Sequence, residues 1–193
     1  FLLLKEAGEF LGLSLCFGEE DIYYIEGGGS LTEAYLQGEL ETLIGKVKRA
    51  VTLDVKSQLP GFSEEFLSSE ARNHLLDAQI GAYLLNPLKN EYSYEDIAKD
   101  YCSLLVPSRA DLLGKASASA ASREQETQFL HWVLFSCYTA FKAWDEISRK
   151  LEETNMQYLF DTVEMPLAFT LFDMEKAGML IRVEELKAYG QEL

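Results

Sequence analysis

The sequence predicts an α/β fold, from three observations on how its apolar residues are arranged. The first quarter contains short alternating, aromatic and β-branched stretches, which are typical of strands. A helix-spaced segment and a further strand-like stretch follow, and the second half holds two long stretches with apolar residues at helical spacing. Strands followed by helix, strand and helix favour a mixed β-sheet flanked by helices.

Three strands are expected near the start of the chain. Residues 1–4 (FLLL), 11–17 (LGLSLCF) and 21–26 (DIYYIE) have strand composition, and residues 18–20 supply a turn. The triple glycine 27–29 ends this meander. No Lys-Ser or Lys-Thr follows it, so we interpret it as a turn rather than a phosphate-binding loop.

The next segment predicts a helix and a strand. Leucines recur on one face of residues 31–46, and Ser30 or Thr32 is a suitable N-cap for that helix. Residues 50–55 (AVTLDV) predict a short buried strand. A loop is expected over residues 57–61, because a proline interrupts them.

Two short helices and a mobile loop are expected in the middle of the chain. Asp77 is the predicted N-cap of a helix over residues 78–85, and Ser93 caps a second helix that ends near Tyr101. Residues 112–122 contain the small polar run SASAAS, which predicts a mobile loop.

Long helices are expected in the last third. The apolar spacing predicts helices over residues 124–153 and 157–176, the second of them kinked at Pro166. Gly178 fits the position that ends this helix, and residues 183–193 begin another.

Composition excludes several classes of protein. The chain has 193 residues, 48% hydrophobic and 25% charged, which is typical of a folded domain rather than a disordered acidic tail. Its 17 basic against 32 acidic residues give a net charge of −15, opposite to the basic footprint of a free-standing nucleic-acid binder. No apolar run approaches the roughly 18 residues of a membrane span, so no membrane partner is expected.

Further expectations concern location and cysteine chemistry. The chain starts at Phe1 rather than at a methionine, so we expect it to begin inside a longer protein. Cys16, Cys102 and Cys137 are widely spaced and odd in number, which predicts reduced core thiols and a cytoplasmic location.

Residue types that carry catalysis form no recognisable motif. Neither His74 nor His131 belongs to a pattern with a serine or cysteine nucleophile. There is no HExxH and no Cys/His cluster with metal-ligand spacing. Composition and spacing alone therefore predict no more than a soluble α/β domain.

Two stretches resemble a known family. Residues 76–101 read LDAQIGAYLLNPLKNEYSYEDIAKDY, and residues 160–193 read FDTVEMPLAFTLFDMEKAGMLIRVEELKAYGQEL. The first is similar to part of the 3′–5′ exonuclease domain of bacterial family A DNA polymerases, the DNA polymerase I type. The second resembles the segment where that domain passes into the polymerase domain, with these residues in register: Glu164, Pro166, Leu167, Met174, Glu175, Gly178, Leu186 and Leu193.

The resemblance implies a fold, a domain division and a lost chemistry. It implies an RNase H-like exonuclease domain, vestigial here, over residues 1–153. Connecting helices and the start of a polymerase domain would follow over residues 154–193. Active members use two divalent metals, Mg or Mn, held by four carboxylates and assisted by a tyrosine. One metal generates the attacking hydroxide, and both stabilise the displaced phosphate oxygens.

The metal-binding positions of the family are altered in this sequence. Its first motif falls near residues 1–4, which offer no carboxylate. Two registers are open for the second motif: Asp54 retains the acid as a relic, or Gln58 stands where the acid belongs. In the third motif His131 replaces the tyrosine and Phe135 replaces the aspartate, and a phenyl ring cannot bind a cation that requires oxygen donors.

The resemblance leaves three functions open. The first is a non-catalytic structural domain of a DNA polymerase I, used in replication and repair. This domain would have no cofactor and no exonuclease or polymerase activity of its own. It would be monomeric, with the polymerase domain of the same chain as its partner, and would reach DNA only through the parent protein.

The other two functions retain contact with DNA. One is an active exonuclease with displaced metal ligands, for which Glu6 or Glu9 could supply a carboxylate. The other is binding of single-stranded DNA without cleavage, for which the candidate contacts are the basic residues Lys46, Lys48, Arg49 and Lys56. The alternative interpretation of this cluster is a solvated helix end, where basic side chains suit the helix dipole.

Overall fold

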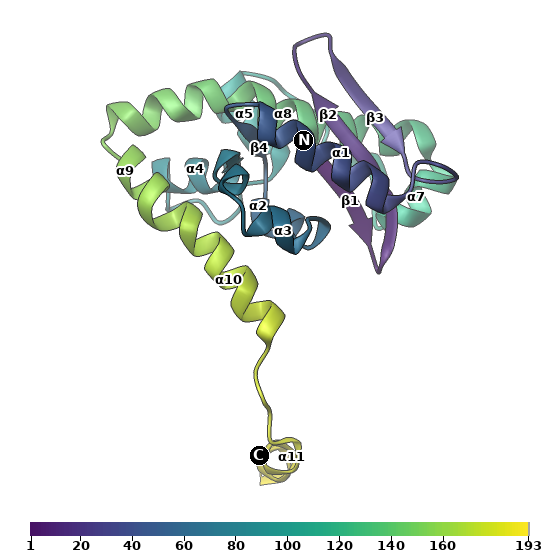
Figure 1. The fold of residues 1–193 in the computed structure, drawn as a ribbon, viewed down its shortest axis with the longest axis vertical. Helices are drawn as coiled ribbons and strands as arrows, with labels where there is room; N and C mark the ends of the chain where they lie inside the picture. Colours follow the sequence, from purple (N-terminus) through teal and green to yellow (C-terminus); the bar gives the residue numbers. More distant parts are fainter. Residues whose placement is uncertain (193) are drawn as a thin grey trace.

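The N-terminal strands form an antiparallel meander in the computed structural model, which describes residues 1–192 (Figure 1). Strands β1 (Leu2–Glu6), β2 (Glu9–Cys16) and β3 (Ile22–Glu26) pair in the order β1-β2-β3. The three predicted strands are confirmed. Gly28 ends the meander in a turn, in which its N–H donates to the Leu31 carbonyl over 3.0 Å.

A second sheet consists of two parallel strands, β4 (Ala50–Thr52) and β5 (Leu75–Asp77). The single mixed sheet predicted from the sequence is thus observed as two small sheets. They approach each other where the Phe1 amino group donates to the Val51 carbonyl over 2.8 Å. Both strands of the second sheet are short because each leads directly into a capped helix.

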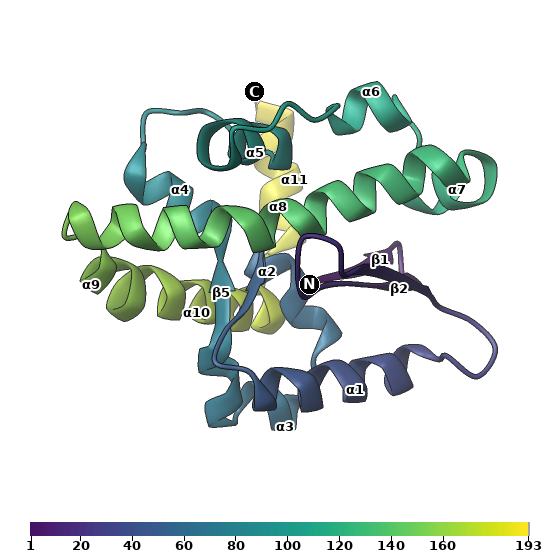
Figure 2. The ribbon, with the colours of Figure 1, turned by 90° about the horizontal axis from the view of Figure 1, so that it is seen from above.

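Helices cover both faces of the meander. Figure 2 shows α8 (Glu126–Glu153) above β1 and β2 and α1 (Glu33–Lys46) below them. Thr32 is the N-cap of α1, and the buried face of this helix carries Leu36, Leu40 and Ile44. Both predictions for this helix, its extent and its cap, are confirmed.

Helix α8 is the longest element, with 28 residues. Its buried face is spaced by three and four residues, as the sequence predicts: Phe129, Val133, Ser136, Cys137, Ala140, Trp144, Ile147 and Leu151. Half-buried Trp132 packs beside them.

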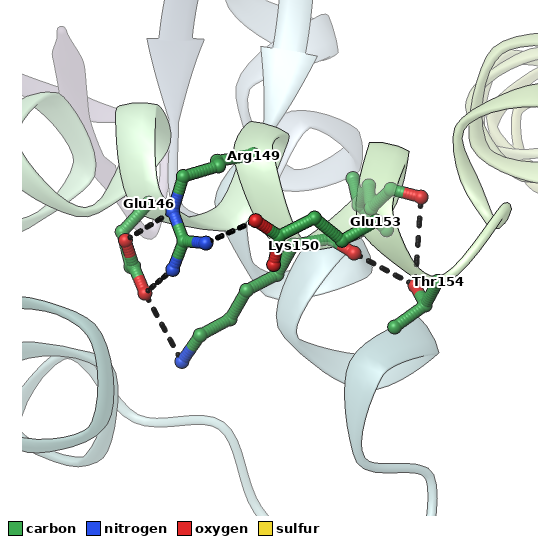
Figure 3. Close-up of polar contacts among 6 residues, drawn as sticks. Glu146, Arg149, Lys150, Glu153 and Thr154 are labelled. Atoms are coloured by element: carbon green, nitrogen blue, oxygen red, sulfur yellow. Dashed lines mark hydrogen bonds and ion pairs between the residues drawn. The ribbon is translucent and has the colours of Figure 1, made fainter.

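The exposed side of α8 carries a polar network near its C-terminal end (Figure 3). The Arg149 guanidinium lies between Glu146 and Glu153, with 2.6 Å from Nη2 to Glu146 Oε1. Lys150 Nζ lies 3.3 Å from the same Glu146 oxygen, and the Lys150 carbonyl accepts from Thr154 Oγ1 over 2.8 Å. Exposed ion pairs at this spacing contribute little to the stability of a helix.

The segment between the two strands of the second sheet is helical rather than a loop. It contains α2 (Val55–Gln58), the 3₁₀ turns η1 (Leu59–Gly61) and η2 (Glu70–His74), and α3 (Glu64–Leu67). The predicted loop over residues 57–61 is therefore wrong. The chain turns here because Asp54 caps α2 and because Val55 and Leu59 are completely buried.

Helices α4 (Ala78–Leu85) and α5 (Tyr94–Cys102) begin at their predicted caps. Asp77 Oδ1 accepts from the Gln79 and Ile80 N–H groups over 2.7 and 3.0 Å. Ser93 Oγ accepts from the Asp96 N–H over 3.3 Å.

The predicted mobile loop over residues 112–122 is wrong. Helices α6 (Arg109–Leu113) and α7 (Ala118–Glu124) occupy most of this segment. Ser108 and Asp111 form a capping box on α6, and Ser117 caps α7. The small residues that suggested mobility allow close packing instead, since Ala118 and Ala121 are buried.

The C-terminal helices follow the predicted path with one change. After α9 (Gln157–Leu159), a π-helical turn, η3 (Phe160–Glu164), leads into α10 (Met165–Ala177) and then α11 (Val183–Glu192). Pro166 lies in the first turn of α10, where its missing N–H favours the wider π turn just before it. Gly178 ends α10 with φ of +69°, as predicted, and residue 193 lies outside the described residues.

The main core joins the two sheets to the C-terminal helices. Residues from β1, β2, α1, α8, η3 and α10 share one apolar cluster, including Leu3, Leu13, Leu40, Trp144, Phe160, Met165 and Ala168. A smaller cluster lies under α6 and α7 and contains Leu4, Leu11, Leu113, Ala118, Ala121, Phe129 and Val133. Buried side chains from both sides of residue 153 share this core. The division into two domains at that residue stays a prediction.

Two further expectations concern cysteines and membranes. All three cysteines are free thiols, Cys137 buried and the other two half-buried. Burial raises the pKa of both Cys16 and Cys102 to about 11. Among residues 1–192, no helix combines the length and the apolar character that crossing a membrane requires.

Candidate functional site

Gln58, one candidate for the second motif, lies against strand β1. It is the last residue of α2 and is 6% exposed. Its Oε1 accepts from the Leu3 N–H over 2.6 Å, and its Nε2 donates to Ser57 Oγ over 3.2 Å. The Gln58 side-chain amide therefore takes the place of a neighbouring strand as the hydrogen-bond acceptor for the Leu3 N–H.

Asp54, the other candidate, is an exposed helix cap. Its Oδ1 accepts from the Ser57 N–H over 3.1 Å, and Ser57 Oγ donates to the Asp54 carbonyl over 2.9 Å. The Asp54 carboxylate is thus hydrogen-bonded to the first turn of α2.

Asp77 is buried close to Asp54 but is held by backbone groups. Besides capping α4, it accepts the Val55 N–H at Oδ2 over 2.7 Å. Burial raises the pKa of Asp77 to about 7, against the backbone hydrogen bonds that lower it. Its predicted role as a cap is confirmed, and the same contact also links α4 to α2.

The third-motif residues lie on α8 with their rings 6.0 Å apart. Phe135 is half-buried against the main core, whereas His131 is exposed. An aromatic ring at position 135 adds apolar contact area and contributes no oxygen donor.

Glu6 and Glu9 both contact α7. Glu6 accepts from the N–H groups of Ala118 and Ser119 over 3.0 and 2.8 Å. Glu9 accepts from Ser119 Oγ over 2.6 Å and pairs with Arg123. These hydrogen bonds lower the pKa of both carboxyl groups. No local pattern predicts this pairing, because the partners are more than 100 residues apart.

A cleft of about 280 Å³ lies along β1, beside these residues. Its walls include the apolar side chains of Leu2, Leu4 and Trp132, with Gln58 on one side. The Arg109 guanidinium lies 5.3 Å from the Trp132 ring centre and donates to the Ala116 carbonyl over 3.0 Å. The cleft is therefore mainly apolar on the side of β1.

The donor set does not fit two divalent cations. Within residues 1–192, no three His, Cys, Asp or Glu side chains converge as a metal site would require. Two hard cations need several carboxylates from different elements, whereas Glu6 and Asp54 accept backbone N–H groups at the starts of α7 and α2 and Glu33 pairs with Lys5.

Two of the four basic residues form ion pairs with acidic side chains. Arg49 Nη2 lies 2.7 Å from Asp145 Oδ1 on α8, and Lys56 Nζ lies 2.5 Å from Glu175 Oε1 on α10. Lys46 ends α1 and, like Lys48, is exposed. The structure thus directs two of the four toward acidic partners on different helices.

Comparison with known proteins gives two relatives. No protein-family model matches the chain. It is 29% identical over 130 residues to DNA polymerase I of Bacillus subtilis (strain 168), which covers 64% of this chain and 14% of that protein. It is 20% identical over 153 residues to DNA polymerase I of Caldicellulosiruptor bescii, which covers 78% of this chain and 16% of that protein. The matched region is thus a small part of each relative.

Proposed function

We propose that this chain, a DNA polymerase I-related domain, is a non-catalytic exonuclease-like domain of a longer DNA polymerase. Its parent would act in DNA replication and repair. An RNase H-like fold is consistent with an antiparallel meander beside a parallel pair, with helices on both faces. The proofreading metal site has been lost, and the role of the domain is structural.

The observation that carries this proposal is the chemistry of the side chains around β1. Residues 1–4 are apolar, Gln58 bonds to the strand backbone, and Phe135 packs against the core. Glu6 and Asp54 each accept backbone N–H groups of a helix. Two-metal catalysis requires several converging charged oxygen donors in this region, whereas the two carboxylates among these residues, Glu6 and Asp54, are each hydrogen-bonded to the start of a helix.

The structural role follows from how the C-terminal helices are attached. Phe160, Met165 and Ala168 are at most 6% exposed and belong to the main core. In the proposed parent, residues 154–193 lead into the polymerase domain. The core would therefore fix the position of the chain where that domain starts.

A nuclease assay tests the proposal. The purified chain is incubated with a 5′-labelled single-stranded oligonucleotide and Mg²⁺ or Mn²⁺, and shortening from the 3′ end is followed. We expect no shortening above that of a mock preparation, and no stoichiometric binding of two Mn²⁺ ions by calorimetry. EDTA-sensitive shortening that Asp54→Ala abolishes, while the exposed control Glu20→Ala retains it, would show an active exonuclease and overturn the proposal.

Single-strand binding without cleavage is the second candidate, and the exposure of Lys46 and Lys48 favours it. Neutralising phosphates with such residues makes binding strongly dependent on salt. The assay is the affinity for a labelled single strand at two salt concentrations, for the native chain and for Lys46→Glu/Lys48→Glu. Salt-dependent binding that the charge reversal removes would support this candidate; equal, weak binding by both proteins would refute it.

A further inference from the structure

Strand β3 is the last strand of the meander, and within residues 1–192 no strand pairs with its outer edge. At the end of its pairing with β2, the Gly27 N–H donates to the Leu11 carbonyl over 2.9 Å. Hydrogen-bonded pairs alternate along an antiparallel ladder, so residues 23 and 25 are the ones that bond to β2 in this register. The backbone groups of the other residues of β3 point away from β2: Ile22, Tyr24 and Glu26.

This edge lacks the sequence features that commonly protect an edge strand. Natural edges are often blocked by lysine, proline or a β-bulge. The sequence of β3, IYYIE, has no lysine or proline, and its register with β2 is regular. In the part of the chain that the structure describes, no hydrogen bond reaches the outward backbone groups of β3. The edge can therefore pair with a further strand.

An apolar groove of about 320 Å³, here named the edge groove, lies beside β3 on the side of the sheet that faces α1. Tyr35 and Leu31 are 53% and 37% exposed in its wall, and Tyr23 of β3 is 51% exposed. Side chains of a strand point alternately to the two faces of a sheet. Every second side chain of an added strand would therefore lie over the edge groove. Its lining includes Leu13, Ile25, Leu31, Tyr35, Leu36 and Glu39.

The surroundings of this edge are acidic. Between Lys5 and Lys46 the sequence has no basic residue and nine acidic ones: Glu6, Glu9, Glu19, Glu20, Asp21, Glu26, Glu33, Glu39 and Glu41. Basic residues from elsewhere pair with three of them, Glu9, Glu19 and Glu33.

The acids nearest to the edge are not neutralised. Glu26 ends β3 and Glu39 lines the edge groove, and both are exposed. Among residues 1–192, neither forms an ion pair, and the same holds for Glu20 and Asp21 in the turn before β3. A second copy of this chain would bring acid against acid here, whereas a cationic partner would be attracted.

We propose that β3 is a docking edge for an extended, basic segment of another protein, in which apolar residues alternate with lysine or arginine. The backbone of the segment pairs with the outward groups of β3, and its apolar side chains lie over the edge groove. Its cations are attracted to Glu26 and Glu39. This inference uses no residue of the cleft along β1 and is independent of the proposed function.

Fluorescence anisotropy with labelled peptides tests the edge. The probe is a peptide of alternating lysine and valine. One control peptide has the same composition with the lysines grouped at one end, and the other has glutamate in place of lysine. We expect the native chain to bind the probe at least about tenfold more tightly than either control. Added salt should weaken this binding, because it screens the attraction between exposed charges.

Variants of the chain separate the groove from the charge. Tyr35→Lys removes an exposed ring from the edge groove and adds a positive charge. Ala34→Lys adds the same charge at an exposed neighbour that does not line the groove. We expect the first variant to weaken probe binding at least about tenfold and the second under about threefold.

A second pair of variants separates the backbone edge from the charge. Glu26→Pro removes the charge and an outward N–H, whereas Glu26→Gln removes the charge alone. The proline variant should therefore bind the probe more weakly than the glutamine variant. Circular dichroism verifies that each variant is folded, and Tyr35→Lys against Ala34→Lys decides if Glu26→Pro is not.

Three outcomes would overturn the proposal. The first is absence of probe binding to the native chain. The second is equal affinity for the alternating and the grouped peptide, or equal affinity of Tyr35→Lys and Ala34→Lys for the probe, since net charge alone would then explain the attraction. The third is a concentration-dependent dimer in analytical ultracentrifugation that Glu26→Pro dissociates, which would mean that a second copy occupies the edge.

Discussion

Gln58 connects α2 to β1 through a buried hydrogen bond to the Leu3 N–H. Its truncation would leave that N–H without a partner in a nearly closed environment. We expect Gln58→Ala to lower the free energy of unfolding by about 2 kcal/mol, the cost of an unpaired buried donor. Urea denaturation measures the change. Gln37 is half-exposed, so Gln37→Ala is the matched control and should lower the free energy of unfolding by under about 0.5 kcal/mol, as for a surface site. An equal loss of stability in both variants would contradict a specific role for Gln58.

Asp77 should make stability depend on pH in an unusual direction. Burial raises its pKa from 3.8 to about 7, so the folded state holds a proton that the unfolded chain releases at lower pH. The free energy of unfolding should then fall as pH rises from about 4 to about 7, by at most about 1.4 kcal/mol per pH unit for one proton.

The test compares native protein with Asp77→Asn by urea denaturation at several pH values. The variant cannot titrate at this position, so its stability should vary less between pH 4 and pH 7. Parallel curves for the two proteins would mean that Asp77 stays ionised across this range, held by its three backbone N–H donors.

Helix α7 depends on a contact from the other end of the sequence. Glu6 accepts two N–H groups of its first turn, at Ala118 and Ser119. We expect Glu6→Gln to destabilise the protein by about 1 kcal/mol, as loss of a helix cap does. Because these bonds lower the pKa of Glu6 below 4.5, the difference from native protein should be full above pH 4.5 and disappear as pH falls further.

Glu9→Gln is the control for this prediction. Glu9 contacts the Ser119 hydroxyl and Arg123 at the surface rather than the first N–H groups of α7. Exposed ion pairs contribute little, so its substitution should cost less than that of Glu6. A greater loss from Glu9→Gln in thermal unfolding would contradict the assignment of Glu6 as the acceptor for the first-turn N–H groups of α7.

Elements whose start and packing are encoded locally could be predicted from the sequence. Thr32, Asp77 and Ser93 cap the helices that their spacing predicted, and the buried face of α8 follows its apolar period. The α6–α7 segment was mistaken for a loop, because its order depends on Glu6 and on burial of small alanines. Neither factor is visible in a local window of sequence.

The candidate site was predictable only in part, for the same reason. That residues 1–4 and position 135 carry no carboxylate could be seen in the sequence. The bond from Gln58 to Leu3 could not, since it joins residues 55 positions apart. Spacing also grouped Arg49 with its basic neighbours, whereas the fold pairs it with an acid on α8.

The net charge of −15 has a different meaning once the whole molecule is considered. Acidic residues of the described chain form ion pairs across its surface, including Glu33 with Lys5 and Asp145 with Arg49. Part of the acidic surplus is thus paired with basic side chains within the fold.

At the scale of the whole molecule, Phe160 decides whether residues 1–153 form an independent unit. Its ring is fully buried, 5.4 Å from that of Trp144, on the far side of the predicted domain boundary. We expect Phe160→Ala to lower the free energy of unfolding by about 3–5 kcal/mol, the usual cost of removing a buried phenyl ring. The control, Tyr158→Ala, removes a ring that is 77% exposed and should change stability by under about 0.5 kcal/mol.

Tryptophan fluorescence during urea unfolding reports the transition at Trp132 and Trp144 together. If the C-terminal helices belong to the core, we expect a single cooperative transition. Its midpoint should shift in Phe160→Ala and stay unchanged in Tyr158→Ala. An unchanged midpoint in Phe160→Ala would instead show that residues 1–153 fold without them.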